Sequence, residues 1–219
     1  MITYEQVKND KSINTYIEQA DRALISMGFT EHSFAHVTKV AHDAAYILTE
    51  LGYDAHTVEI AKIAGYLHDI GNLVNRNGHS LTGAVMAFRI LDRMGMNPDD
   101  LSAIVSAIGN HDEGTGFAVN PFAAALIIAD KSDVRRSRVR NSDIKNFDIH
   151  DRVNYSVEKA ELLLDVQNKT ITLDLKIDTQ ISPVMEYFEI FLTRMNMCRT
   201  AAQTLGLNYS LIINGQKII

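Results

Sequence analysis

The sequence predicts a mostly α-helical bundle that ends in a small α+β subdomain. Up to about residue 140, apolar residues recur every three or four positions, which is typical of amphipathic helices. Beyond that point, stretches rich in aliphatic and β-branched residues alternate with turn residues, as in strands. The chain has 219 residues, 46% hydrophobic and 22% charged, and so can bury a sizeable core. We expect a helical domain over residues 1–140 and an α+β subdomain over residues 141–219 packed on it.

Six helices are expected in the first part, and local signals mark several of their ends. Gly28 and Gly52 follow the first two periodic segments, where glycine commonly ends a helix. Asp54 is a good cap for the third helix, and Pro98 and Pro121 suit the first turns of the last two. The expected helices cover approximately residues 13–28, 37–52, 54–68, 79–95, 98–111 and a final segment that starts at residue 121 and has residue 130 near its middle.

The second part predicts a β-β-α-β-β order of elements. A polar connector over residues 141–152 leads to two strands, at residues 161–166 and 170–177, joined at Asn168-Lys169. A long amphipathic helix begins after Ser182-Pro183 and is closed by Gly206. Asn214-Gly215 lies between two short apolar runs and is a strong hairpin signal. This part contains no motif with an evident chemical role.

Composition excludes several classes of protein. The single cysteine, Cys198, cannot form an intramolecular disulfide, and its apolar helical pattern favours a buried structural thiol. The N-terminus lacks the layout of a secretory signal, and the longest apolar run is much shorter than the roughly 20 residues that cross a bilayer. We therefore expect a cytoplasmic protein with no membrane partner. The net charge of −6 argues against bulk nucleic-acid binding, and a homodimer stays open.

Six histidine and aspartate side chains lie at helix ends or on predicted helices and form the candidate metal site. Imidazoles and carboxylates suit borderline transition metals such as Fe, Mn, Zn or Co, and ionisable groups are seldom buried without a partner. Ligands from several helices can converge on one point inside a bundle. We therefore predict one or two divalent transition-metal ions bound by His36, His68, Asp69, His79, His111 and Asp130.

The order of these six residues resembles the HD-domain superfamily of metal-dependent phosphohydrolases. The resemblance covers about residues 30–140 and depends on the whole ordered set, because an isolated His-Asp pair such as His42-Asp43 has no following glycine and carries little information. The matching segments are His32-Ser33-Phe34-Ala35-His36-Val37, Leu67-His68-Asp69-Ile70-Gly71, Gly78-His79-Ser80-Leu81, Ile108-Gly109-Asn110-His111-Asp112-Glu113 and Ile128-Ala129-Asp130-Lys131.

This resemblance implies an HD-type helical bundle and a dinuclear metal site that hydrolyses a phosphate ester. Asp69 has two carboxylate oxygens and could bridge two cations. One ion would be held by His36, His68, Asp69 and Asp130, and the second by Asp69, His79 and His111. Two such ions would activate a bridging hydroxide as the nucleophile and clamp the phosphoryl oxygens. The expected substrate is a nucleotide or another small phosphate ester, either a monoester or a diester.

A basic segment begins directly after Asp130. Spacing places Lys131, Arg135 and Arg138 on one face of a helix, where they could orient the phosphate and offset charge in the transition state. We assign catalytic roles to Asp69, Lys131 and Arg135. The expected substrate-binding residues are Asn72, Arg76, Arg135 and Arg138, with the loops of residues 71–78 and 114–117 as further walls of the substrate mouth.

Other interpretations stay open at this point. The same ligand set is found in HD-fold di-iron oxygenases, so the ligands alone also allow oxidation of a small polyol or phosphonate. A non-catalytic nucleotide-sensing module is a third alternative. Asn72 stands where enzymes of this family that cleave cyclic di-guanylate usually have lysine, which argues against that substrate. Asp112 and Glu113 are candidates to orient His111, whereas we assign structural or solvated roles to His32, His42, His56 and His150.

Overall fold

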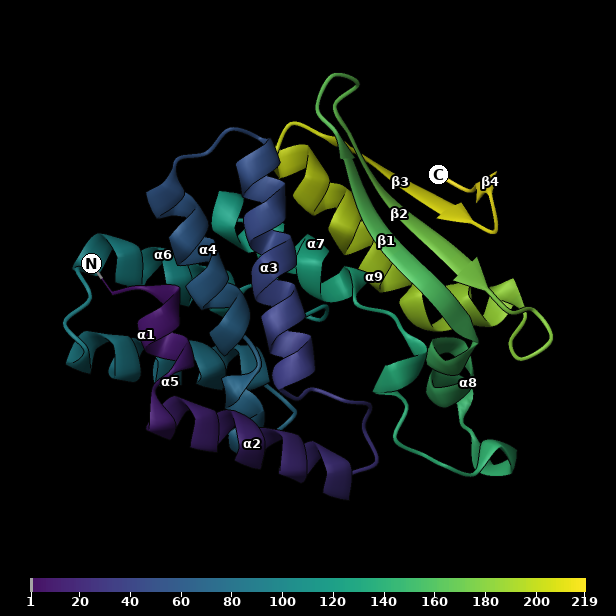
Figure 1. Cartoon of the computed structure of the whole chain (residues 1–219), viewed down its shortest axis with the longest axis horizontal. Coiled ribbons are helices and arrows are strands. Elements are labelled where there is room, and N and C mark those ends of the chain that lie inside the picture. Colours follow the sequence, from purple (N-terminus) through teal and green to yellow (C-terminus); the bar gives the residue numbers. More distant parts are fainter. Residues whose placement is uncertain (1) are drawn as a thin grey trace.

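The computed structural model describes residues 2–219 and confirms the mostly helical fold with a small C-terminal sheet (Figure 1). Three short 3₁₀ turns, at Ile70–Leu73, Arg136–Arg138 and Ile144–Asn146, connect longer elements. The helices within these residues are α1 (Tyr4–Lys8), α2 (Lys11–Ser26), α3 (Phe34–Glu50), α4 (Ala55–Leu67), α5 (His79–Arg93), α6 (Pro98–Gly109), α7 (Pro121–Ser132), α8 (Ile149–Ser156) and α9 (Val184–Thr204). The strands are β1 (Val157–Asp165), β2 (Thr170–Ile177), β3 (Asn208–Ile213) and β4 (Gln216–Lys217).

Side-chain caps fix where four of the site-bearing helices, α3, α4, α6 and α7, begin. Ser33 accepts a hydrogen bond from the Ala35 N–H at the start of α3, and Asp54 accepts one from the Thr57 N–H at the start of α4. Asn97 and Asn120 do the same for α6 and α7, each directly before a proline in the first turn. The helix starts predicted near residues 54, 98 and 121 are therefore confirmed.

Helix α7 is the central helix of the bundle. Every residue from Ala123 to Ala129 is fully buried, and α7 packs against α3, α4, α6 and α9. Helices α3 and α4 also approach each other closely at Gly65, where a Cβ atom would lie 2.7 Å from the Ala41 Cα. Close packing of α3, α4 and α7 brings residues 36, 68 and 130 to the same region of the core.

The C-terminal part forms one four-stranded sheet in the order β1-β2-β3-β4, with α9 between β2 and β3 in the chain (Figure 1). The pairs β1–β2 and β3–β4 are the two predicted hairpins, and β2 pairs with β3 in parallel. Lys169 and Asn214 adopt positive φ in the two turns. Helix α9 connects the parallel strands and packs against both α7 and β3, so it lies between the sheet and the helical bundle.

Two sequence predictions differ from the structure near residue 140. Helix α7 ends at Ser132, so Asp130 lies in its last turn and the basic segment does not continue the helix. The segment after α7 instead pairs with a distant part of the chain: Arg138 Nε donates to the Glu31 carbonyl at 2.9 Å, and the Glu31 N–H donates to the Arg138 carbonyl at 2.8 Å. The expected connector contains the start of α8 at Ile149.

The buried core is continuous across residue 140, and the division into two domains stays a prediction. No helix within residues 2–219 is long and apolar enough to span a membrane.

Candidate metal centre

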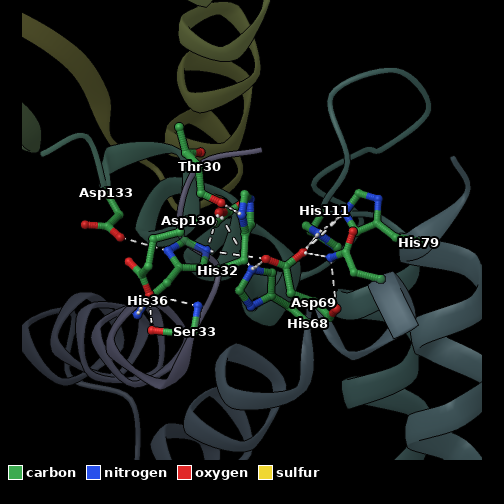
Figure 2. Close-up of polar contacts among 12 residues, drawn as sticks. Thr30, His32, Ser33, His36, His68, Asp69, His79, His111, Asp130 and Asp133 are labelled. Carbon is green, nitrogen blue, oxygen red and sulfur yellow. Dashed lines mark hydrogen bonds and ion pairs between the residues drawn. The ribbon is translucent and has the colours of Figure 1, made fainter. Parts of the chain in front are cut away.

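The six predicted ligands come together at one buried point (Figure 2). His36 lies on α3, His68 and Asp69 directly follow α4, and His79 is the first residue of α5. His111 lies two residues after the end of α6, and Asp130 lies in the last turn of α7. None is more than 9% exposed, and the set consists of His36, His68, Asp69, His79, His111 and Asp130. Two groups within it, His36 with His68 and Asp130, and His68 with Asp69 and His111, have ligand atoms that all lie within 4.8 Å of one another.

Hydrogen bonds fix the orientation of all four imidazoles. In each ring, Nδ1 faces an acceptor that cannot donate, so Nδ1 carries the proton and Nε2 is left to take a proton or a metal ion. The acceptors are an aspartate for His36 and backbone carbonyls for the other three rings. The distances from Nδ1 are 2.8 Å for His36 to Asp133 Oδ2, 2.7 Å for His68 to the Gly65 carbonyl, 3.0 Å for His79 to the Arg76 carbonyl and 2.7 Å for His111 to the Ile108 carbonyl.

One half of the cluster surrounds the Nε2 atoms of His36 and His68. These buried atoms have no hydrogen-bond partner within residues 2–219. His36 Nε2 lies 3.3 Å from Asp130 Oδ1, and His68 Nε2 lies 3.2 Å from Asp69 Oδ2. Two ligand atoms that bind one ion at about 2.1 Å are roughly 3.0–3.4 Å apart. These separations therefore fit a shared metal ion, which would also satisfy the two unpaired nitrogens.

The other half of the cluster lies on the opposite side of Asp69. Its Oδ1 atom is 3.4 Å from His79 Nε2 and 3.9 Å from His111 Nε2. The two nitrogens are 3.2 Å apart, and each ring already uses Nδ1 to donate to a carbonyl. Two lone pairs that face each other repel unless a cation lies between them. Asp69 thus directs one oxygen toward each half of the cluster, as Figure 2 shows.

The electrostatics of the cluster favour bound positive charge. Burial raises the pKa of Asp69, but the neighbouring His68 and His36 rings outweigh this effect and hold the pKa well below its usual range. Burial likewise raises the pKa of Asp130, and Lys131 leads the opposing contributions that hold it well below its usual range. Burial lowers the pKa of His68, but the two carboxylates raise it to about 10. Negative charge is therefore concentrated where the Nε2 atoms point.

A buried aspartate that the sequence prediction missed holds His36 in place. Asp133 is fully buried, and its second oxygen accepts a hydrogen bond from Arg135 Nε at 2.9 Å. Arg135 also bonds Glu31 at 2.7 Å, while Arg138 Nε bonds the Glu31 carbonyl at 2.9 Å. The prediction that Arg135 and Arg138 line one helical face with Lys131 is wrong, because the helix ends before them. Their contacts support Asp133 instead, and their roles in substrate binding stay predictions.

The remaining predicted residues contact the ligand carboxylates. Asn72 is buried and donates to Asp69 Oδ1 at 2.9 Å, while Arg76 lies 3.9 Å from the same oxygen. Lys131 is 2.7 Å from Asp130 Oδ2 and 3.5 Å from Glu113. Asp69 Oδ1 and Asp130 Oδ2, the two carboxylate oxygens that do not face His36 or His68, therefore each have a further polar neighbour. Whether Asn72, Arg76 or Lys131 touches a substrate stays a prediction.

A cavity of about 370 Å³ lies beside the cluster. Arg76, from the predicted loop of residues 71–78, lines it on the side of Asp69, and Arg138 and Glu113 also contribute. Residues 114–117, predicted as a further wall, are not among the lining residues. His32 is part of the wall, and its ring centroid is 5.4 Å from that of His36, so it is closer to the site than expected. The opposite wall comes from α8 and α9 and was not predicted. It includes Asp148, His150, Asp151, Asn154, Ile190, Phe191 and Arg194.

Gly71 should be essential for placing His79. A Cβ atom at this position would overlap the His79 carbonyl oxygen and the Gly83 nitrogen, which are backbone atoms of α5. Gly71→Ala must therefore displace the start of α5, and we expect the free energy of unfolding to fall by about 2–3 kcal/mol. Urea denaturation followed by circular dichroism measures this change. Gly114→Ala is the control, since the nearest atom to a Cβ there is 3.8 Å away; equal stability of the two variants would contradict the expectation.

Comparison with known proteins agrees with this geometry. A family model described as HD domain matches residues 33–163, more than half of the chain. The chain is also 26% identical, over 183 aligned residues, to the uncharacterized protein MJ1020 of Methanocaldococcus jannaschii, with 73% of this chain and 70% of that protein covered. The matched region contains all six residues of the buried cluster. The chain therefore belongs to the HD-domain family.

Proposed function

We propose that the protein is a metal-dependent phosphohydrolase that acts on a nucleotide or another small phosphate ester. The observation that carries this proposal is the shared carboxylate of Asp69, which faces one set of nitrogens with Oδ2 and another with Oδ1. A purely structural metal site is closed by its protein ligands, whereas this cluster adjoins a cavity. The ligands suit one or two divalent ions of Fe, Mn, Zn or Co.

Residues around the cluster support phosphate chemistry. Bound divalent ions would supply an activated water and draw charge from the phosphoryl group. The chain itself adds Arg76, 33% exposed in its side chain and 3.9 Å from Asp69, and Lys131, which holds Asp130 Oδ2 so that Oδ1 faces His36. A volume of about 370 Å³ is near the lower end of small-molecule sites, which favours a mononucleotide or a smaller ester over a polymer.

A substrate panel with defined metals tests the proposal. Metal-free protein should be loaded separately with Mn, Fe, Co or Zn and incubated with nucleotides, cyclic phosphodiesters and sugar phosphates. We expect release of phosphate or a nucleoside monophosphate. A strong chelator should abolish this activity and lower the melting temperature, because the buried Nε2 atoms of His36 and His68 then lose their partner. Readdition of the metal should restore both.

Two outcomes would contradict the proposal. Oxygen consumption with a polyol or phosphonate, without phosphate release from any ester, would show an oxygenase with the same ligands. A ligand that raises the melting temperature but is never turned over would show a sensing module.

A further inference from the structure

Arg194 stands out among the arginines around the cavity. It lies in the middle of α9, outside the region that the HD-domain family model matches. It lines the cavity together with Arg76 and Arg138. The sequence gives one signal for it: Phe191, Arg194 and Cys198 are spaced three and four residues apart, so a charged residue interrupts the buried face of an apolar helix. A charge in such a position needs a partner or a ligand.

The guanidinium of Arg194 makes its hydrogen bond through Nε alone. Its Nε donates to Glu113 Oε1 at 2.9 Å, and its Cζ lies 4.2 Å from the centroid of the Phe191 ring. The two Nη groups make no hydrogen bond within residues 2–219, although the side chain is only 21% exposed. A fixed guanidinium with two free donor groups matches the planar, two-point geometry of phosphate oxygens.

Arg135 and Arg138, the arginines that the sequence assigned to the phosphate, are engaged more fully. Arg135 uses Nε, Nη1 and Nη2 in hydrogen bonds to Asp133, Ser137 and Glu31. Arg138 uses Nε and Nη1 on backbone carbonyls, and its side chain is almost fully buried. Arg194 is therefore better placed than either of them to bind an anion from the cavity.

Arg194 also lies close to the ligand cluster. Glu113, which holds Arg194, is 3.5 Å from Lys131 Nζ, and Lys131 Nζ is 2.7 Å from Asp130. Arg76 lies on the other side of the cluster, beside Asp69. An anionic group in the cavity between these side chains would face the cluster with a guanidinium on each side.

We propose that Arg194 binds the phosphoryl group of the substrate, so that α9 of the C-terminal part completes the substrate site of the HD domain. This inference rests on the proposed function, since it assumes that the ligand is a phosphate ester. It assigns recognition of the phosphate to Arg194 in place of Arg135 and Arg138. Arg194 contributes its two free Nη groups and a positive charge and leaves the metal ligands unchanged.

Binding of inorganic phosphate to the metal-loaded, full-length protein tests the assignment. Isothermal titration calorimetry should show phosphate binding to the wild type, about 10-fold or more weaker binding to Arg194→Gln, and an intermediate affinity for Arg194→Lys, which keeps the charge but loses the fork. Metal content should stay at the wild-type value. Arg199→Gln is the matched control, because it removes the same charge from an exposed position on the same helix.

Each other outcome has a defined meaning. Wild-type phosphate affinity in Arg194→Gln, equal losses in Arg194→Gln and Arg199→Gln, or absence of phosphate binding by the wild type would overturn the assignment. Loss of metal together with phosphate in Arg194→Gln would also overturn it, because Arg194 would then act only through Glu113, Lys131 and Asp130. If no ester is hydrolysed but phosphate binding still depends on Arg194, the proposed function fails and the anion site stands.

Discussion

Asp69→Ala should remove metal binding and activity together. Asp69 is the one residue whose two carboxylate oxygens face both halves of the cluster, at 3.2–3.5 Å from His36 and His68 and at 3.4–3.9 Å from His79 and His111. Its loss leaves four imidazoles around one remaining carboxylate. We expect metal content by elemental analysis to fall below about a tenth of the wild-type value and phosphate release to fall by about three orders of magnitude or more.

The chain contains its own control for this variant. His42-Asp43 is a second His-Asp pair, and Asp43 pairs with Lys39 at 2.5 Å and is not one of the six predicted ligands. Asp43→Ala should keep full metal content and activity. Phosphate release by Asp69→Ala at a rate near that of Asp43→Ala would rule out the proposed mechanism.

Asp133→Ala should weaken metal binding from outside the ligand set and destabilise the fold. Asp133 orients His36 through its bond to Nδ1, and partners of metal-bound histidines typically change metal affinity by about 10–100-fold. Burial raises the pKa of Asp133, but the bond to His36 and the charges of Arg138 and Arg135 hold it far below its usual value. Removing this carboxylate takes a negative charge from beside the buried Arg138 and removes the acceptor of Arg135 Nε and His36 Nδ1, which should cost about 3–5 kcal/mol of unfolding free energy.

Competition with a chromophoric chelator measures the metal affinity, and urea denaturation measures the stability. Asp133→Asn should lie between wild type and Asp133→Ala, since its amide oxygen can still accept from His36 Nδ1 but the charge is lost. Asp92→Ala, on the exposed face of α5, should match the wild type in both measurements. Unchanged metal affinity in Asp133→Ala would show that His36 needs no support from Asp133.

The helices and the cluster were predictable because both depend on local sequence. Periodicity and caps such as Asp54 and Asn120 place the ends of α4 and α7 within a few residues. Histidine and aspartate at the ends of apolar helices are conspicuous, and the following glycine and the order of the other ligands distinguish His68-Asp69 from His42-Asp43. Gly71 belongs to the same sequence segment, and its missing side chain lets the chain pass next to α5.

What could not be predicted depends on contacts between distant parts of the chain. Asp133 bonds a histidine 97 residues away, and nothing in its local sequence separates it from the surface acids of a basic segment. The end of α7 depends on the same tertiary contacts, so helical spacing wrongly grouped Lys131 with Arg135 and Arg138. Arg194 reaches the cavity only because β2 and β3 pair in parallel and direct α9 across the bundle.

The position of α9 between two paired strands has a consequence for how tightly a ligand can bind. Short connections join α9 to β2 and β3, and these strands are hydrogen-bonded to each other, so the helix cannot slide along or rotate about its axis independently. Arg194 lies near the midpoint of α9, and its Nε is tied to Glu113. The conformational entropy of α9 and of the Arg194 side chain is therefore already lost when the chain folds, before any ligand binds. A ligand that enters the cavity therefore meets a preorganised guanidinium, and less of its binding free energy is spent on ordering the protein.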